Sequence, residues 1–171
     1  MPQAAEQMRD KLRPGAWVVS MQNGICTDAL AKVVGREHTV GCVIGWGATM
    51  HAPGELEMTS EGEFIIGRID GGDATALQPL QQAMQSVVPT EISQTILSEL
   101  YSKLIVNACI TSLGAICGLR LGEMLKIKQA RKIFLAIIGE AVQVAQAMRL
   151  HVPPFGGKLD YDCLLYTSRC V

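Results

Sequence analysis

The fold of this chain is decided by the stretch Ala16-Trp-Val-Val-Ser20-Met-Gln-Asn-Gly24-Ile-Cys-Thr-Asp28-Ala-Leu-Ala-Lys-Val-Val34-Gly35. Residues 16–22 are mostly apolar and end in an Asn-Gly turn, which is typical of a buried strand. A short helical pattern follows at 27–34, and an apolar run at 39–50 indicates the next strand. A strand, turn, helix and strand in this order form the unit whose carboxyl edge binds ligands in parallel sheets.

Patterns on both sides of this unit predict further elements. Residues 3–13 form a helical pattern that Pro14-Gly15 ends. Segments 55–59 and 63–66 are expected to pair as a hairpin across 60–62, and Asp73 is expected to cap a helix that reaches about residue 86. An extended piece at 90–93 precedes helical patterns at 94–116, 121–126 and 128–149. The sequence therefore predicts an α/β part followed by an all-α part, with a domain boundary near 88–93.

Three polar residues, Lys103, Asn107 and Thr111, interrupt the apolar helical pattern at 94–116. Residues four apart fall on one side of an α-helix, so the three are expected to form one stripe. A buried lysine is costly unless the protein needs it, whereas most helix lysines reach solvent at the edge of a helix. Spacing alone leaves both interpretations open.

Taken in order, several segments of the chain resemble the ketopantoate reductase family. They are Gln22-Asn23-Gly24, Gly45-Trp-Gly-Ala48, Pro53-Gly54, Phe64-Ile-Ile-Gly67, and Lys103-Leu104 with Asn107. The stretch Pro153-Pro-Phe-Gly-Gly-Lys-Leu-Asp-Tyr161 is also similar to one branch of that family. The resemblance covers residues 1–161. It implies the C-terminal part of a Rossmann-type dinucleotide-binding domain joined to the start of a helical C-terminal domain.

The resemblance also implies a reaction, the NADPH-dependent reduction of a 2-oxo acid, with ketopantoate as the leading candidate. In this family Lys103 would be the general acid, and Asn107 and Thr111 would bind the substrate. Asn23, Gly24 and Ala48 would contact NADP(H). Family members often have asparagine where this chain has Thr111 and Leu121. The chemistry is therefore expected to carry over more safely than the identity of the substrate.

Both ends of the chain depart from the family pattern. No Gly-x-Gly-x-x-Gly loop occurs in the sequence, so residues 1–90 are expected to be a partial NADP-binding domain. Residues 91–162 are expected to be a partial helical domain. The segment 163–171, which carries two cysteines, is expected to be a non-native tail. We therefore expect the chain to be an internal fragment that is inactive alone.

Composition excludes several other classes of function. A formal net charge of −1 offers no basic surface for nucleic acid. The apolar run 104–119 is broken by polar residues and is expected to be too short to span a membrane. Scattered cysteines on apolar segments indicate free buried thiols in a reducing compartment, the cytoplasm. The histidines lack the spacing of metal ligands, and no metal site is expected.

Two alternatives to a reductase of ketopantoate stay open. The chain could be a helical packing or dimerisation module that keeps the family fold without its activity, and a homodimer through the helical domain would suit its two long apolar helices. It could also be a reductase with another hydride acceptor, which would differ at Thr111 and Leu121. Lys103 separates the first alternative from catalysis, because leucine or methionine would pack better in a purely structural helix.

Overall fold

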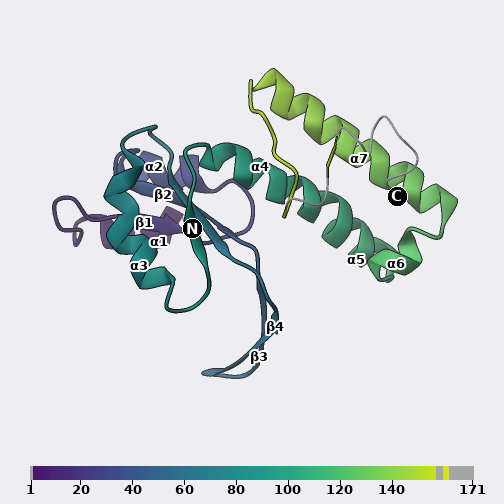
Figure 1. Ribbon diagram of the computed structural model, residues 1–171, viewed down its shortest axis with the longest axis horizontal. Coiled ribbons are helices and arrows are strands. Elements are labelled where there is room, and N and C mark those ends of the chain that lie inside the picture. Colours follow the sequence, from purple (N-terminus) through teal and green to yellow (C-terminus); the bar gives the residue numbers. More distant parts are fainter. Residues whose placement is uncertain (1, 157–159, 162–171) are drawn as a thin grey trace. The chain divides into compact units, whose positions relative to one another are not determined.

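The structure is a computed structural model that describes residues 2–156, 160 and 161, and it divides into two units (Figure 1). The first unit ends at Leu100 and the second begins at Tyr101. The division falls inside α4 (Ile96–Val106), downstream of the boundary that the sequence suggests near 88–93. The proposed tail at 163–171 lies outside the described residues.

A four-stranded sheet with the order β1-β2-β5-β6 forms the centre of the first unit. Its strands are β1 (Val18–Ser20), β2 (Thr39–Ile44), β5 (Phe64–Arg68) and β6 (Thr90–Ile92). β1 and β2 are parallel and are joined through α2 (Thr27–Val34), as the sequence predicts. β5 runs antiparallel to β2, and β6 runs parallel to β5. The α/β prediction for this part of the chain is confirmed.

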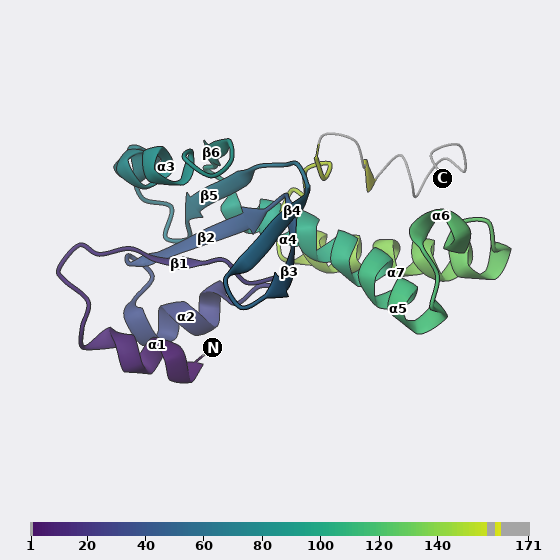
Figure 2. The same ribbon diagram turned by 90° about the horizontal axis from the view of Figure 1, so that it is seen from below.

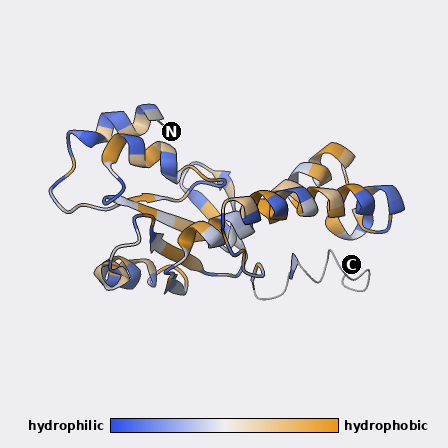
Figure 3. Cartoon of the chain, turned by 90° about the horizontal axis from the view of Figure 1, so that it is seen from above, coloured by the Kyte–Doolittle hydropathy of each residue, from blue (hydrophilic) through white to orange (hydrophobic). Residues whose placement is uncertain are grey.

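Helices cover both faces of this sheet (Figure 2). On one face α1 (Pro2–Arg9) and α2 enclose a small core of Ala5, Val18, Leu30 and Val34. On the other face η1 (Ala74–Leu77) and α3 (Gln78–Met84) cover a core of Val40, Cys42, Phe64, Ile66, Leu77 and Val88. The two cores account for the apolar colouring of the central strands in Figure 3.

The first turn of α4 packs against the sheet because the sheet has glycines beneath it. A Cβ at Gly67 would lie 2.6 Å from the carbonyl oxygen of Ser93 and 2.6 Å from the Cβ of Ile96. A Cβ at Gly41 would lie 2.8 Å from the Cγ1 of Ile96. Side chains at these two positions would push the helix away. The glycines therefore set where α4 starts.

The predicted hairpin between 55–59 and 63–66 is wrong. Residues 39–50 form two strands, because the chain breaks at Gly45-Trp46 between β2 and β3 (Gly47–Ala52). β3 pairs with β4 (Glu55–Ser60) across a tight turn in which Gly54 has φ 83°. Pro followed by a left-handed glycine is a strong turn signal, and it determines the partner of β4. β5 pairs with β2 instead.

Element ends also differ from the sequence prediction. α1 ends at Arg9 rather than near residue 13, and a turn leads from it to Gly15. Asp73 does cap a helix, since its side chain accepts a hydrogen bond from the backbone N–H of Thr75. That helix starts as a 3₁₀ turn and continues as α3. Differences of a few residues are expected where hydrogen bonding frays at helix ends.

The second unit consists of helices packed around one core. After α4 come η2 (Asn107–Ser112), α5 (Leu113–Cys117), α6 (Leu121–Met124) and α7 (Lys128–Ala147). The buried core residues are Ile105, Cys109, Leu113, Met124, Ala130, Phe134, Ile138, Val142 and Tyr161. On α7 the buried positions recur every three or four residues, as an amphipathic helix requires. The prediction of a helical second part is confirmed.

One helix is more continuous than the sequence suggests. α4, η2 and α5 form a single helix from Ile96 to Cys117, which by length and composition alone could cross a membrane. The expectation that this apolar run is too short is therefore corrected. The central helix of a soluble protein has the same length and composition, and Ile105, Cys109 and Leu113 of this helix lie in the core of the second unit.

An ion pair at the end of β5 gives a testable link between pH and stability. Arg68 donates two hydrogen bonds to Asp70, and its guanidinium lies 4.8 Å from the Trp17 ring centroid. The Arg68 bond, followed by the backbone N–H of Gly72, lowers the pKa of Asp70 from 3.8 to about 2. A carboxyl group with a lowered pKa stabilises the fold above pH 3.8, and this contribution is lost as the pH falls toward 2.

We therefore expect Asp70→Asn to lower the free energy of unfolding at neutral pH by about 1 kcal/mol, a value reduced for solvent screening. The measurement is urea unfolding followed by the fluorescence of the two tryptophans, both of which lie in the first unit. The loss should shrink in acid. Asp10→Asn is the matched control, because Asp10 is 80% exposed in its pair with Arg9. An equal loss in both variants would contradict the assignment.

Candidate active site

The first group of predicted site residues lies in the loop after β1. β1 ends at Ser20, and Asn23 and Gly24 follow before α2 begins at Thr27. Gly24 has φ 85°, a conformation that side chains rarely adopt. Asn23 is exposed, and its carbonyl oxygen accepts a hydrogen bond from the Cys26 thiol. The loop thus turns the chain sharply at the carboxyl end of a parallel strand, as the sequence predicts.

Ala48 lies beyond the carboxyl end of the neighbouring strand. β2 ends at Ile44, and Gly45 and Trp46 lead into β3, where Ala48 pairs with Met58 and is exposed. β1 and β2 are adjacent and parallel, so the loop with Asn23 and the segment before Ala48 leave the same edge of the sheet. This is the edge at which parallel sheets bind nucleotides.

Two buried polar atoms at this edge have no hydrogen-bond partner among the described residues. They are the Thr27 hydroxyl, at the start of α2, and the Trp46 indole N–H, just after β2. Buried donors and acceptors without partners are rare unless a ligand or water completes them. The residues present therefore fit one end of a bound dinucleotide. Asn23, Gly24 and Ala48 are the side chains and backbone that would hold it.

Lys103 is the central residue of the second group. It lies in the last turns of α4, and its side chain is half-buried. The ammonium Nζ lies 4.9 Å from the ring centroid of Phe155. Burial lowers the pKa of Lys103, because desolvation disfavours the charged form. An ammonium that loses its proton more readily than ordinary lysine is better suited to proton donation.

Asn107 and Thr111 continue the helix from Lys103, but the turn that carries them is not α-helical. Residues 107–112 form a π-helix, with Asn107 half-buried and Thr111 exposed. Four α-helical residues advance about 40° beyond a full turn, and the longer π turn offsets this advance. Lys103, Asn107 and Thr111 therefore stay on one side of the helix. π turns occur often at functional sites.

Each group lies within its own unit. Asn23, Gly24 and Ala48 belong to the first unit and follow neighbouring strands, while Lys103, Asn107 and Thr111 belong to the second and share one helix. Leu121, at the start of α6, is partly exposed. The structure thus places the first group after the ends of two neighbouring strands and the second group on one helix.

Sequence reasoning missed Phe155 as a neighbour of Lys103. It lies in the loop after α7, about fifty residues further along the chain, where Pro153-Pro154 and Gly156 surround it. An aromatic residue in a Pro/Gly-rich loop is a weak signal, since such loops often expose their side chains. Only the fold brings this loop back to α4.

Two buried cysteines, Cys42 and Cys109, are poor nucleophiles. Burial raises the pKa of Cys42 to about 12 and that of Cys109 to about 11. Both thiols are free and stay protonated at neutral pH. Cys26 is half-buried and Cys117 is exposed. Among the described residues, the prediction of free thiols therefore holds for these four cysteines, while the prediction of burial holds for two.

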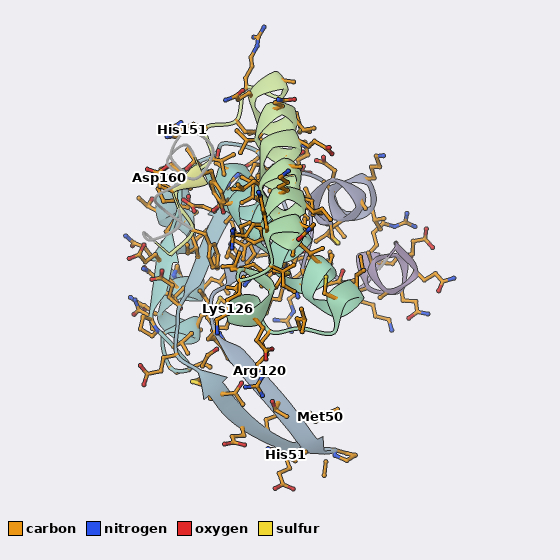
Figure 4. The ribbon with its side chains drawn as sticks, turned by 90° about the vertical axis from the view of Figure 1, so that its right-hand side faces the viewer. Met50, His51, Arg120, Lys126, His151 and Asp160 are labelled. Carbon is orange, nitrogen blue, oxygen red and sulfur yellow. The ribbon has the colours of Figure 1, made fainter. Side chains whose placement is uncertain are left out.

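A cavity of about 270 Å³ lies at the end of α7. Its lining consists of Val142, Gln146, Leu150, His151, Val152, Pro154, Asp160 and Tyr161, and Figure 4 labels His151 and Asp160. None of the predicted site residues lines it. On β3, Figure 4 shows Met50 and His51 near the end of the hairpin, where His51 Nε2 lies 2.7 Å from Glu57 Oε2. This pair is exposed, and we assign it no catalytic role.

Two family models match this chain. One, described as Ketopantoate reductase PanE/ApbA, matches residues 1–71. The other, described as Ketopantoate reductase PanE/ApbA C terminal, matches residues 95–160 and so includes Lys103, Asn107 and Phe155. Together the matches cover about four fifths of the chain. They agree with the ordered set of motifs in the sequence.

Individual relatives agree with these models. The 2-dehydropantoate 2-reductase of Pyrococcus abyssi is 27% identical over 144 residues, which are 82% of this chain and 47% of that protein. The crystal structure of a ketopantoate reductase from Ralstonia eutropha is 26% identical, with a TM-score of 0.76 over 88% of this chain and 49% of that one. The chain thus spans about half the length of these relatives.

A likeness of fold extends to a protein with another name. The complex of D-mandelate dehydrogenase with NADH matches 99% of this chain and 54% of that chain, with a TM-score of 0.82 and 21% identity. At this identity the match concerns the fold alone. A mixed α/β part followed by helices therefore also occurs in a protein that is not named a ketopantoate reductase.

Proposed function

We propose, on the premise that this chain belongs to the ketopantoate reductase family, that it forms part of an NADPH-dependent reductase of 2-oxo acids. The single observation that carries the proposal is Lys103, a half-buried lysine with a lowered pKa in a helix that also presents Asn107. A structural helix gains nothing from a desolvated ammonium. A reductase needs a proton donor beside the carbonyl oxygen of its substrate, and Lys103 would be that donor.

The reaction follows from these groups. When bound, NADPH would supply the hydride that reduces the carbonyl carbon of the 2-oxo acid. As the C–H bond forms, the π bond of the carbonyl breaks and negative charge develops on its oxygen. The Lys103 ammonium stabilises that charge and then gives its proton to the oxygen, forming the O–H bond of the 2-hydroxy acid. Neutral Lys103 regains a proton from water.

Other residues of each unit would hold the reactants. We propose that Asn107 binds the substrate, because an amide both donates to a carboxylate and accepts from a hydroxyl. Thr111 would add a hydroxyl on the same side of the helix. Within the first unit, Asn23, Gly24 and Ala48 would bind NADP(H), and the two nearby buried polar atoms without a partner among the described residues support this proposal.

Ketopantoate is the leading substrate, since the curated relatives from Pyrococcus are named 2-dehydropantoate 2-reductase. The pocket residues argue for testing other 2-oxo acids as well. Thr111 offers fewer polar groups than asparagine, and Leu121 offers none. A site rejects a substrate that lacks a hydroxyl because polar groups of the site are then left without partners. A site with fewer such groups therefore discriminates less strongly against that substrate.

Other aspects of the proposal follow from composition and family. We expect a cytoplasmic enzyme that binds neither nucleic acid nor membrane and acts on a small molecule. We also propose a homodimer through the helical part. Its support is a partly exposed apolar stripe on α7, in which Ile133 and Val144 are each 51% exposed and Met148 is 55% exposed. Apolar stripes of this kind mark protein contacts.

The same stripe would also be expected for the second candidate, a packing module without activity. That protein would need the helices of the second unit but not the ammonium of Lys103. An exposed apolar stripe does not distinguish the two candidates. A measurement of catalytic turnover does distinguish them.

The test joins residues 1–162 to the flanking sequence that their gene encodes and follows the consumption of NADPH and NADH with ketopantoate and other 2-oxo acids. We expect turnover with NADPH and ketopantoate, and none from the 171-residue chain alone. If circular dichroism shows that the joined protein is folded, but the protein reduces no 2-oxo acid, the result would support the packing module. Turnover by the chain alone would contradict our expectation that it is inactive.

A further inference from the structure

The loop after α7 returns to α4 and is held there by a buried serine. Ser102, the residue before Lys103, is 1% exposed. Its hydroxyl donates a hydrogen bond of 2.9 Å to the carbonyl oxygen of Pro153. The Tyr161 hydroxyl donates one of 2.7 Å to the Ser102 carbonyl oxygen. The loop is therefore fixed on both sides of Phe155, two residues before it and six after it.

These contacts stay satisfied across the working pH range. Tyr161 is 4% exposed, and desolvation raises its pKa to about 12, so the phenol keeps its proton and remains a donor. A buried hydrogen bond to a backbone carbonyl gains strength from its low-dielectric surroundings. The contact between Ser102 and Tyr161 therefore works as an anchor for the loop and does not titrate near neutral pH.

The anchored loop places the ring of Phe155 against the ammonium of Lys103. Nζ lies 4.9 Å from the ring centroid, within the distance at which a cation is attracted to an aromatic face. Phe155 itself is half-buried and packs against the core of the second unit. Among the described residues, no carboxylate forms an ion pair with Lys103. Within the described part of the chain, the aromatic ring is thus a partner of its charge.

Simple packing does not explain this arrangement. A lysine at a helix edge usually lays its methylene stem on apolar neighbours and places its ammonium in water. Here the charged atom itself lies over the ring, and burial lowers the pKa of the ammonium. A ring over the charge also removes some of the orientations that a flexible lysine would otherwise sample.

We propose that Phe155 is a positioning residue for Lys103: its ring holds the ammonium in place beside the substrate site and keeps water from one side of it, and the contacts of Ser102 with Pro153 and Tyr161 hold the ring. This inference rests on the proposed reductase function. Phe155 acts through Lys103 and takes no part in the transfer of hydride or proton. Its contribution is to orient Lys103, since a misplaced proton donor slows a reaction strongly.

The ring has two opposite effects on the charge, and different substitutions separate them. An aromatic face stabilises the ammonium, whereas the volume of the ring excludes water and destabilises it. Phe155→Leu keeps apolar volume without the aromatic face, so the pKa of Lys103 should fall further. Phe155→Ala admits water, so the pKa should rise toward its ordinary value. Phe155→Tyr keeps both effects and should preserve the wild-type behaviour.

The test uses the 171-residue chain, with its lysines reductively methylated with ¹³C, and follows the Lys103 methyl signal by NMR. Lys103→Arg identifies that signal by its loss. We expect a ring-current shift in the wild type and in Phe155→Tyr, its absence in Phe155→Leu and Phe155→Ala, and titrations of the last two that move in opposite directions. Lys126, which is exposed next to α6 (Figure 4), is the internal control and should not change.

A Lys103 signal that is unchanged in both Phe155→Leu and Phe155→Ala would overturn the proposal, even if the joined protein proves to be an active reductase. In the active protein we expect Phe155→Leu to lower kcat about tenfold with little change in KM, and Phe155→Tyr to restore it. Loss of kcat without the NMR change would also overturn it. NMR changes in a joined protein without turnover would support the contact and count against the reductase function instead.

Discussion

Replacing Lys103 with leucine is expected to lower kcat of the joined reductase by about 10²- to 10⁴-fold. Leucine fills the half-buried position and keeps the helix, but it removes both the proton donor and the cation that stabilises the developing alkoxide. KM should change less, because Asn107 and Thr111 remain. The measurement is steady-state oxidation of NADPH with saturating 2-oxo acid.

The matched control for this loss is Lys126→Leu. Lys126 lies between α6 and α7, is exposed, and has no part in the proposed site (Figure 4). Its variant should keep wild-type turnover. If Lys103→Leu is as fast as this control, Lys103 is not the general acid, and the family resemblance would extend to the fold alone.

The same lysine predicts how activity depends on pH. A general acid must hold its proton, so kcat should fall as the pH rises through the pKa of Lys103. Burial lowers that pKa, and the fall should begin at lower pH than for an ordinary lysine. Burying the charge also destabilises the fold below this pKa, and the cost is relieved as the pH rises above it. Lys103→Leu should therefore be no less stable than the wild type.

The sequence was sufficient to predict that Lys103 and Asn107 share one helix, because the relevant pattern is local. Lysine and asparagine four residues apart in an apolar helix are visible without any tertiary information, and the structure places both on one helix. Phe155 could not be predicted in the same way. Its contact with Lys103 depends on a loop that returns over about fifty residues and is fixed by Tyr161.

The strands show the same limit. The pairing of β1 with β2 follows from a strand–helix–strand pattern, and it was predicted. The pairing of β4 was predicted wrongly, because two strand-like segments lie equally near to it in the sequence. The Pro53-Gly54 turn favours the pairing of β4 with β3. β5 pairs with β2 instead, at the centre of the sheet, where Phe64 and Ile66 are buried. Burial, which no short window reveals, decides between such alternatives.

The π turn at 107–112 is a third feature without a sequence signal. Its residues, Asn107-Ala-Cys-Ile-Thr-Ser112, have no glycine or proline that would mark a break, and the expected element was an ordinary helix. The turn joins Lys103 in α4 to the core contacts of α5. A π turn departs from regular α-helical hydrogen bonding, which has an energetic cost. We infer that the turn is kept because it places Asn107 and Thr111 on the side of the helix that carries Lys103.

Replacing Ile138 with alanine is expected to be the most damaging change to the second unit. Ile138 is fully buried in the middle of α7, in contact with the core that includes Ile105 and Phe134. Truncating a buried isoleucine removes its transfer free energy and leaves a cavity, at a cost of about 2–5 kcal/mol. The measurement is urea unfolding followed by far-ultraviolet circular dichroism, which reports mainly on the helices.

Ile133→Ala on the same helix separates burial from helix propensity. Ile133 is 51% exposed, and alanine is the better helix former, so the free energy of unfolding should change by less than about 0.5 kcal/mol. Both tryptophans lie in the first unit, so their fluorescence reports its unfolding separately. If Ile138→Ala shifts both signals together, the units unfold cooperatively. If Ile133→Ala is as costly as Ile138→Ala, the apolar stripe of α7 is covered in solution, as the proposed dimer requires.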